Sequence, residues 1–355
     1  MSKTGKWLLI FGAVALAGVI LFAVSVAAFG VRDGNYGISI GGNEIGSIKI
    51  GGFNMGNFLP GNSGIHFRNG TTTYDFDFET GKQYDLSFGG EEIKDLDISL
   101  AICTANIVCS DTDTAALKYT AGNAKTSFTA EAQNGTLRIL EKPASWFNFG
   151  TFKNSSLELT LPETVYESVV LNLASGKIAT SGLTSDSLSV TLASGSMDLG
   201  AYADDIGINV ASGKMALTNC TDKKAANLNV EVASGTAEVN GLQADRTKAE
   251  LASGNIILNG ISGRFDGEIA SGKLTAVFSE WTDDIGLQLA SGKADITLPA
   301  GSGVNAKLQK LSGSMSIDLD GSSTKLTSNT TATFGGANVH DLTAEVASGS
   351  ISVHN

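Results

Sequence analysis

The chain has 355 residues, of which 43 are Gly and 4 are Pro, and aromatic residues make up 7% of it. Its formal net charge is −12, which argues against nucleic acid or an anionic lipid surface as a partner of the folded part. Three cysteines are too few for a disulfide framework.

A membrane-spanning helix is the first predicted element, at Trp7–Phe29, where Ser25 is the one conventional polar residue. This length is sufficient to cross a bilayer. Because Lys3 and Lys6 precede it, the positive-inside rule places the N-terminus in the cytoplasm and the C-terminal domain outside the cell. A cleaved signal peptide, with a small-residue site at Ser25-Val26-Ala27, is the alternative, and both interpretations export the remainder.

Four regions follow from composition and pattern. Residues 1–30 hold the N-terminal transmembrane anchor, and residues 31–70, rich in Gly and Asn, are predicted to be a flexible stalk, with a short hairpin among the isoleucines as the alternative. Residues 71–165 are predicted to form degenerate N-terminal coils and a cap. Residues 166–355 carry the regular repeats.

The degenerate region alternates apolar and polar residues, which is typical of strands. Two strands are expected in residues 71–88, a first coil in Ile93–Ser110 with Asn106 at its turn, and three strands in Ala115–Leu140. The Asn134–Gly135 pair favours a tight hairpin between the last two. The aromatic cluster Trp146–Phe149 is predicted to plug the open end of the core, and a sugar- or lipid-contacting patch is the alternative.

A Ser-Gly turn recurs nine times in the second half of the chain, first as LASGKI and then in forms such as NVASGKM and EVASGTA. Successive glycines are 19, 18, 22, 19, 18, 20, 21 and 36 residues apart, and such self-similarity is the signature of a repeat architecture. The turn glycines are Gly176, Gly195, Gly213, Gly235, Gly254, Gly272, Gly292, Gly313 and Gly349.

Apolar residues alternate on both sides of each turn, which predicts two strands per repeat. Leu188, Val190 and Leu192 precede Gly195 at a spacing of two, and Met197 and Leu199 follow it at the same spacing. One such unit cannot bury its own apolar face, whereas stacked units can. The sequence therefore predicts an all-β fold, a parallel β-solenoid of about 19-residue coils, with right-handed crossovers and with glycine supplying a positive φ at each turn.

The C-terminal end is predicted from the doubled gap before Gly349. Asn329 stands where an additional turn glycine is expected, because Asn also adopts left-handed backbone. Ile351–Asn355 finish the predicted last strand, so its open edge, with the side chains of Leu342, Val346, Ile351 and Val353, is a predicted site of self-association or strand addition. The alternative is that the Ser/Thr-rich segment Ser322–Val339 folds back over this end.

The segment LELTLPETVYESVVLNLASGKIATSGL, preceded by IKDLDISLA and followed by recurring LASG turns, resembles a bacterial domain family of unknown function known as "putative adhesin". The family is common in Gram-positive bacteria, and the resemblance covers about residues 93–353. It implies a cell-surface β-solenoid and, in some members, a link to envelope-stress responses. It implies no catalytic residues.

The residues that could form a catalytic or metal-binding site are scattered along the sequence. Asp204-Asp205 and Asp283-Asp284 occupy similar places in two coils, and solvated corner residues explain them better than a Ca²⁺ site. Lys177, Lys214, Lys273 and Lys293 follow turn glycines and are expected to face solvent. His66, His340 and His354 are too far apart in the sequence for a metal site or a triad.

The three cysteines are interpreted by position. Cys103 and Cys109 have the same strand parity and are interpreted as small core residues, with a bridge between them as the alternative in an oxidising compartment. Cys220 lies in a turn, and nothing suggests a nucleophile.

We therefore predict a membrane-anchored extracellular β-solenoid that is an interaction or structural module of the cell envelope, without catalysis, metal or cofactor. Its predicted partners are the membrane, through the N-terminal helix, and a cell-surface protein or polysaccharide. An envelope-stress sensor that signals through the single helix is one alternative. A carbohydrate-active β-helix enzyme is the other.

Overall fold

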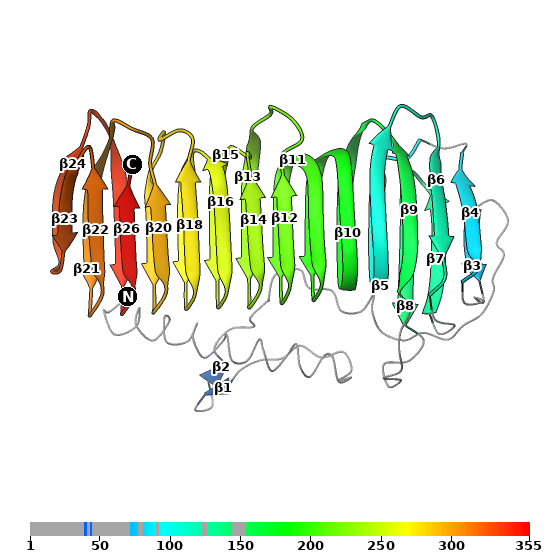
Figure 1. Cartoon of the computed structure of the whole chain (residues 1–355), viewed down its shortest axis with the longest axis horizontal. Helices are drawn as coiled ribbons and strands as arrows, with labels where there is room; N and C mark the ends of the chain where they lie inside the picture. The colour runs from blue at the N-terminus through cyan, green and yellow to red at the C-terminus, as the bar shows by residue number, and fades with distance from the viewer. Residues whose placement is uncertain are drawn as a thin grey trace.

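The computed structural model describes residues 39–40, 43–44, 72–76, 81–89, 92–122, 126–143 and 154–355. Every helix or strand assigned in these ranges is a β-strand, and Figure 1 shows the strands from β3 to β26 side by side along one elongated rod. No helix in the described ranges is long and apolar enough to cross a membrane. The helix predicted at Trp7–Phe29 and the aromatic plug at Trp146–Phe149 lie outside the described residues.

One coil shows how the repeat is built. In the Gly235 coil, β13 (Ala225–Val232) leads into the tight Ala-Ser-Gly corner and β14 (Thr236–Asn240) leaves it, after which a return corner leads to the next coil. We call the sheet formed by strands before the tight corner face A, and the sheet formed by strands after it face B. Each coil is named after the residue at its tight corner.

The two faces run the length of the rod. In spatial order, face A contains β3 (Thr72–Phe76), β7 (Thr126–Gln133), β8 (Thr136–Pro143), the start of β5 (Asp95–Ser110), both ends of β10 (Val165–Leu192), the end of β11 (Ser196–Val210), β13, β15 (Ala244–Leu251), β17 (Arg264–Ile269), β19 (Ile285–Leu289), β25 (Asn338–Val346), β21 (Ser302–Lys310) and β24 (Thr330–Gly335).

Face B contains, in the same order, β4 (Gln83–Phe88), β6 (Ala115–Thr120), β9 (Ser155–Pro162), the end of β5, the middle of β10, the start of β11, β12 (Lys214–Thr218), β14, β16 (Asn255–Ile261), β18 (Lys273–Phe278), β20 (Lys293–Thr297), β26 (Ser350–His354), β22 (Ser314–Leu319) and β23 (Ser322–Leu326). Separately, β1 (Ser39–Ile40) and β2 (Asn43–Glu44) form an antiparallel pair.

The core lies between the two faces as columns of aliphatic side chains. Parallel pairing in register places Leu192, Val210, Val232, Leu251 and Ile269 in one column, each at most 3% exposed. Burial of one such side chain contributes about 1.5–3 kcal/mol. The predicted all-β, solenoid-like fold is confirmed, with parallel pairing through the middle of the rod and mixed pairing at both ends.

The tight corner is held by backbone hydrogen bonds between coils. Ala233 N donates to Val210 O at 2.8 Å, and Ser234 N donates to Ala211 O at 2.9 Å. At Gly235, a Cβ atom would lie 2.5 Å from Gly213 O in the previous coil. This close approach excludes any side chain.

The predicted reason for the glycines needs correction. Among the nine, φ is positive at Gly176, Gly195, Gly213, Gly254 and Gly272. It is not in the left-handed region at Gly235, Gly292, Gly313 or Gly349, where the backbone or side chains of the coil beneath leave no room for a Cβ atom. Close stacking, rather than positive φ alone, requires glycine in this column.

The first coil has its corner at a different residue from the predicted one. Cys103 aligns with Gly176, whereas Asn106 aligns with Ala179 inside the strand, so the placement of Asn106 at the turn is wrong. Local sequence suggested Asn106 because Asn tolerates turns, but the register with the next coil decides the position.

The N-terminal end departs from sequence order. Toward the N-terminal end of the rod, the parallel neighbours of β5 are β8 and β9, although β6 and β7 come directly after β5 in the chain. Antiparallel strands β7 and β6 lie beyond them, and β3 and β4 are outermost. The predicted hairpin between β7 and β8 is confirmed, with φ of 52° at Asn134 and 77° at Gly135.

The C-terminal end departs from sequence order in the same way. Strands β25 and β26 lie between the Gly292 coil and the Gly313 coil, paired with β19 and β20 on one side and with β21 and β22 on the other. The prediction that the last strand, at Ile351–Asn355, forms the open edge is therefore wrong. Leu342, Val346, Ile351 and Val353, expected to be exposed there, are at most 1% exposed.

The segment after β22 folds back over this end, as the alternative interpretation held. Strand β23 pairs antiparallel with β22, and β24 pairs antiparallel with β21. Asn329 lies between them, and its Oδ1 accepts a hydrogen bond from Lys310 N at 2.8 Å, so Asn329 is not an additional turn of the column. Both ends of the rod thus finish in antiparallel strands.

Candidate functional site

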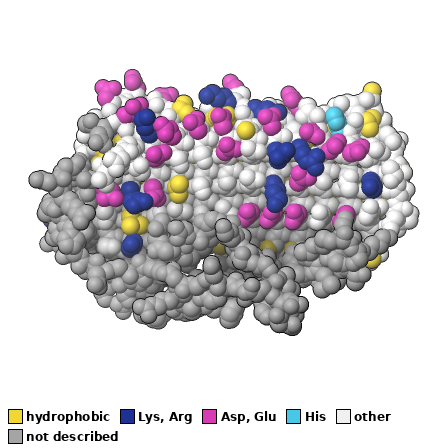
Figure 2. All heavy atoms as spheres, turned by 180° about the vertical axis from the view of Figure 1, so that it is seen from behind, with side chains coloured by type: hydrophobic (Ala, Val, Ile, Leu, Met, Phe, Trp, Pro, Cys, Tyr) yellow, Lys and Arg dark blue, Asp and Glu magenta, His cyan; other side chains and the backbone are white. Residues whose placement is uncertain are grey.

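The outward positions of the coils form straight columns of side chains, because every coil is paired in register with the next. On face A, Glu231, Glu250 and Glu268 are aligned in consecutive coils, and Gln288 and Glu345 continue the same column. Figure 2 shows acidic side chains in a row along the back of the rod. We call these five residues the acidic column.

At one end of the acidic column, the ionised form of a carboxyl group is destabilised. Burial and the neighbouring Glu250 raise the pKa of Glu231, while Lys248 opposes the shift. Lys248 lies two residues before Glu250 on the same face and forms an ion pair with it, which raises the pKa of the lysine. Because their strands are about 4.8 Å apart, these carboxylates form an anionic array suited to an extended partner rather than to a small molecule.

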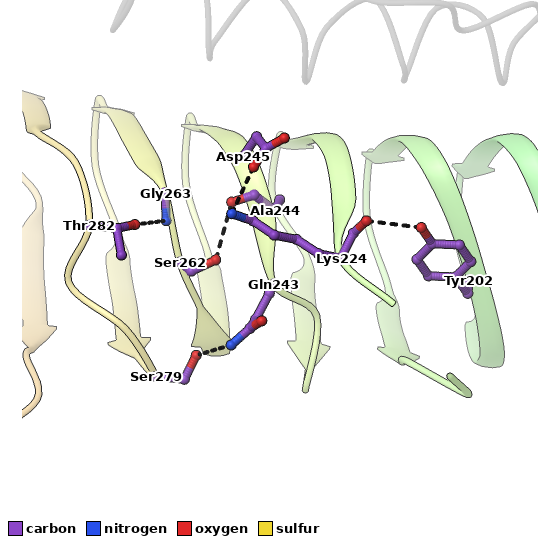
Figure 3. A network of polar contacts seen from close by, with 9 residues as sticks. All are labelled: Tyr202, Lys224, Gln243, Ala244, Asp245, Ser262, Gly263, Ser279 and Thr282. Carbon is purple, nitrogen blue, oxygen red and sulfur yellow. Dashed lines mark hydrogen bonds and ion pairs between the residues drawn. The ribbon is translucent and has the colours of Figure 1, made fainter. Parts of the chain in front are cut away.

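The return corners are joined from coil to coil by polar contacts, shown in Figure 3. Tyr202 Oη donates to Lys224 O at 3.0 Å, and Lys224 Nζ lies 2.7 Å from Asp245 Oδ1. Further along, Ser262 Oγ donates to Ala244 O at 3.3 Å. These contacts hold adjacent corners together, and most of their partners are backbone atoms, which favours a structural role.

The paired aspartates are engaged by protein groups. Asp204 shares the Tyr202 hydroxyl proton with Lys224 O, and Asp205 accepts a hydrogen bond from Asn227 Nδ2 at 2.6 Å. In the other pair, Asp284 Oδ1 accepts from Asp341 N at 2.9 Å. In the described part of the chain, no group of three or more His, Cys, Asp or Glu side chains is arranged to hold a metal ion.

The lysines that follow turn glycines and the histidines were also considered in the sequence. The four lysines that follow turn glycines, Lys177, Lys214, Lys273 and Lys293, are exposed on face B. His340 contacts the ring of Trp281 edge-on at 5.4 Å, whereas His354 Nε2 lies 3.0 Å from Asp295 Oδ1. His66 lies outside the described residues. Lys273 Nζ lies 3.6 Å from Asp295 Oδ2, so Lys273 and His354 share one carboxylate, and Lys273 is aligned with Lys293 of the next coil.

The aromatic residues of the regular coils belong to the core. Tyr166, Tyr202, Phe265, Phe278 and Trp281 are all at most 4% exposed. Trp281 also donates from Nε1 to Gly303 O at 3.0 Å. These rings are therefore not available on the surface to stack on a sugar.

A buried carboxylate that the sequence interpretation missed lies at the N-terminal end. Glu141, fully buried, accepts hydrogen bonds through Oε2 from Ala101 N at 3.0 Å and Ile102 N at 2.8 Å. Its Oε1 accepts from Tyr119 Oη at 3.0 Å and from Ser155 Oγ. In other coils such corner N–H groups donate to carbonyl groups of the coil beneath. Glu141 replaces those acceptors where the chain leaves the coil after Pro143, so its role is structural.

Cys103 occupies the position of the turn glycines in this first coil, at the corner that Glu141 contacts. Its thiol is fully buried beside Ser155 and Glu141, and burial first, then Glu141, raise its pKa. A bridge from Cys103 to Cys109 is excluded, because six residues of extended strand separate their Cα atoms by about 20 Å, whereas a disulfide needs less than about 7 Å. All three thiols are free in the structure.

A comparison with protein families shows to which family the chain belongs. The model of the Toastrack DUF4097 family matches residues 93–354. The chain belongs to this family. The Toastrack region thus begins just before β5 and includes both the regular coils and the reordered C-terminal end. The comparison with curated proteins gave no match.

Several solved structures resemble this Toastrack chain at low sequence identity. A "putative adhesin" from Bacteroides fragilis NCTC 9343 has 12% identity over 77% of this chain and 97% of its own, with a TM-score of 0.39. A "putative cell adhesion protein" from Clostridium sporogenes ATCC 15579 has 12% identity, coverage of 78% and 99%, and a TM-score of 0.21. A "putative lipid binding protein" from Parabacteroides distasonis ATCC 8503 has 13% identity, coverage of 77% and 97%, and a TM-score of 0.31.

Proposed function

We propose that this protein is a membrane-anchored rod on the outer side of the cell membrane that serves as an interaction or structural module of the cell envelope, without catalysis. The apolar stretch Trp7–Phe29 and the lysines before it support the anchor and the orientation. Membership of the Toastrack family supports a surface module.

The observation that carries the proposal is the contrast between the ends and the sides of the rod. Antiparallel strands cover both ends, whereas the two faces display straight columns of polar side chains, including the acidic column. A surface of this kind offers many equivalent contacts to an extended partner. We propose a cell-surface protein or polysaccharide bearing positive charge as the partner, because the carboxylates would be complementary to it.

Topology is tested by adding protease to intact cells or protoplasts from which any outer barrier has been removed. The Gly-rich segment at residues 41–64 should be cut, and an antibody against the rod should detect the released fragment. Complete protection until the cells are lysed would place the rod inside the cell and end the proposal.

Partner binding is tested by a pull-down from intact cells with the exported rod as bait. Replacement of Glu231, Glu250 and Glu268 by Gln should reduce capture and its dependence on salt, because the array loses its charge. The matched control replaces three exposed lysines of face B, Lys177, Lys214 and Lys273, by Gln. Equal loss of capture in both triple variants would show that face A is not the binding face.

A further inference from the structure

Face A carries opposite charges at its two edges in two consecutive coils. Arg246 stands near the start of β15 and Glu250 near its end, and Arg264 and Glu268 occupy the same positions in β17. Parallel pairing aligns Arg246 with Arg264 and Glu250 with Glu268. The two coils therefore present arginine beside the return corner and glutamate, from the acidic column, beside the tight corner. Figure 2 shows basic and acidic side chains close together on this face.

Between these two edges runs a third set of outward residues, which we call the middle column. It consists of Gly207, Asn229, Lys248, Asp266, Gly286 and Thr343. Its two charged members are paired within the chain, since Lys248 forms an ion pair with Glu250, and Arg264 Nε lies 3.0 Å from Asp266 Oδ2. The middle column therefore adds little net charge to face A.

Arg246 and Glu268 are left without an ion-pair partner. Both side chains are exposed, and neither forms an ion pair or a side-chain hydrogen bond with another described residue. They belong to adjacent coils and lie at opposite edges of face A. A partner that satisfies both must therefore offer a carboxylate at one edge and a cation at the other.

Gly207 adds a second observation, since the rod itself does not require glycine at this position. Its φ is not in the left-handed region, and a Cβ atom there would have no neighbour within 4 Å. Glycine in the interior of a strand weakens the strand and often marks a place where another backbone approaches closely. No described residue of the chain approaches this side of Gly207, so the close approach is expected from outside.

We propose that face A binds face A of a second copy of this chain, with the two rods side by side, pointing in the same direction and related by a two-fold axis parallel to the rods. An axis above the middle column places the arginine edge of one copy opposite the glutamate edge of the other, at the same level of the rod. Arg246 of one copy then faces Glu250 and Glu268 of the partner. The reciprocal contacts follow from the symmetry, so each contact is made twice.

The direction of the two rods distinguishes this arrangement from its alternative. Rods that pointed in opposite directions would bring arginine edge against arginine edge and glutamate edge against glutamate edge, which is repulsive. Two copies anchored in one membrane by the same terminal segment must point in the same direction, so this step rests on the proposed function. The second copy is then the positively charged cell-surface protein to which the acidic column is complementary.

The net charge of −12 restricts where two copies can meet. Most of the surface of one rod repels that of another, because both are acidic. At Arg246, Lys248 and Arg264, in contrast, cations from two adjacent strands lie side by side on face A. Two copies therefore attract each other at the level of β15 and β17.

The first test measures the protein mass of the full-length chain in detergent, by size-exclusion chromatography with light scattering. Wild type should be a dimer at low salt and should dissociate as salt is added, because exposed ion pairs are screened. Arg246→Glu and Glu268→Arg should each raise the dimer dissociation constant at least about tenfold, because each turns attractive contacts into repulsive ones. Lys214→Glu, an exposed charge reversal on face B, is the matched control and should leave the dimer unchanged.

Mixing the two face A variants gives the sharpest outcome. Arg246→Glu and Glu268→Arg should pair with each other more tightly than either pairs with itself, because every contact between positions 246 and 268 then joins opposite charges. Since both side chains are exposed and have no ion-pair partner within the chain, neither variant should lower the melting temperature appreciably.

A second measurement locates the axis. Gly207→Cys places a thiol in the middle column, where the two copies meet, and the added side chain has room. Ala216→Cys is the matched control, because Ala216 lies in the same coil but faces outward on face B. With Cys220→Ser in both variants to remove the exposed thiol, mild oxidation of the protein in isolated membranes should give disulfide-linked dimers for Gly207→Cys alone.

A wild type that remains monomeric at low salt, a dimer that neither charge reversal weakens, or equal cross-linking at both positions would overturn the inference. A monomeric rod that still captures another partner through the acidic column would do so while leaving the proposed function intact. A dimer with the expected properties, from cells in which the Gly-rich segment resists protease until lysis, would instead overturn the proposed location and leave the pairing of the rods standing.

Discussion

A hydroxyl buried in the aliphatic core shows what a single position contributes at the residue scale. Thr247 is fully buried between Leu228 and Phe265 in one inward column, and its Oγ1 has no hydrogen-bond partner in the described structure. An unpaired buried hydroxyl opposes folding because it loses its hydrogen bonds to water.

Thr247→Val should therefore stabilise the rod by about 1 kcal/mol, since valine has the same shape and no polar atom. The measurement is the urea midpoint of unfolding. Ser262→Ala is the matched control, because Ser262 is equally buried but donates to Ala244 O, and it should destabilise by about 1 kcal/mol. A lower midpoint for Thr247→Val would mean that the hydroxyl has a partner after all.

The glycine column predicts a large effect from a single added side chain. Gly235→Val should destabilise by about 3 kcal/mol, because its Cβ would lie 2.5 Å from Gly213 O and 2.8 Å from Val210 Cγ1. Lys214→Ala, an exposed neighbour in the same part of the rod, should change stability by less than about 0.5 kcal/mol. Equal urea midpoints for the two variants would contradict the close stacking of the corners.

The acidic column predicts a dependence on pH. The pKa of Glu231 is raised in the folded state, so its ionised form costs stability at neutral pH, and this cost disappears as the pH falls through the folded pKa and then the unfolded one. Glu231→Gln should stabilise the rod by about 0.5 kcal/mol at pH 7. The advantage should vanish below about pH 4, where the carboxyl is neutral in both states.

The reciprocal variant fills the gap in the same column. Gln288→Glu places a carboxylate between Glu268 and Glu345 and should destabilise at pH 7 but not below about pH 4. Thermal unfolding of both variants across pH 4–8 measures the two effects. If Gln288→Glu were neutral at pH 7, the carboxylates of adjacent coils would not interact appreciably.

At the scale of the element, β26 decides how the C-terminal end is built. It is a central strand with neighbours on both sides, since Ser352 aligns with Asp295 in β20 and with Ser316 in β22. Strand β23, by contrast, has a neighbour on one side, is short and is mostly exposed. Short, polar edge strands of this kind discourage pairing with other chains.

Ser352→Pro should destabilise the rod by about 3 kcal/mol, because proline removes a backbone donor from the middle of a sheet. Ser352→Ala retains the donor and should change little, and Ser322→Pro at the first residue of edge strand β23 should be tolerated. Melting temperatures give the comparison. Tolerance of proline at 352 would return β26 to the edge of the rod.

At the scale of the whole molecule, antiparallel strands cover both ends of the rod. At each end, the coil beside these strands is placed out of sequence order. An uncovered end would expose the edges of two parallel strands and the apolar column between them. The rod is therefore not expected to self-associate through its ends, and we expect partners to bind its two faces.

Removal of the C-terminal cover should convert this end into a self-association site. Replacing residues 321–336 by a four-residue linker deletes β23 and β24 and should give concentration-dependent oligomers in sedimentation velocity. A matched variant that replaces only the turn residues 327–329 by Gly should remain monomeric. A monomeric deletion variant that still melts cooperatively would show that the cover is not needed.

The sequence by itself determined the local features. Alternation with a period of two gave the strands and their inward residues, as at Leu192 and Val210, because the pleat places alternate side chains on opposite faces. The corner column was predictable in the nine coils with a Ser-Gly turn because glycine recurs there at nearly constant spacing, whereas Cys103 in the same column was not. The hairpin at Asn134–Gly135 was predictable because these residues adopt positive φ at little cost.

Only the tertiary structure decided the order of coils at the ends and the long-range contacts. Stacking in sequence order would place β21 beside β19, but the structure places β25 there, and local alternation alone does not distinguish Ala306 from Leu342 beside Ile285. The choice depends on which arrangement covers the last apolar face. Glu141 at the first corner is also a product of this stacking, since strand pairing brings together residues far apart in the chain.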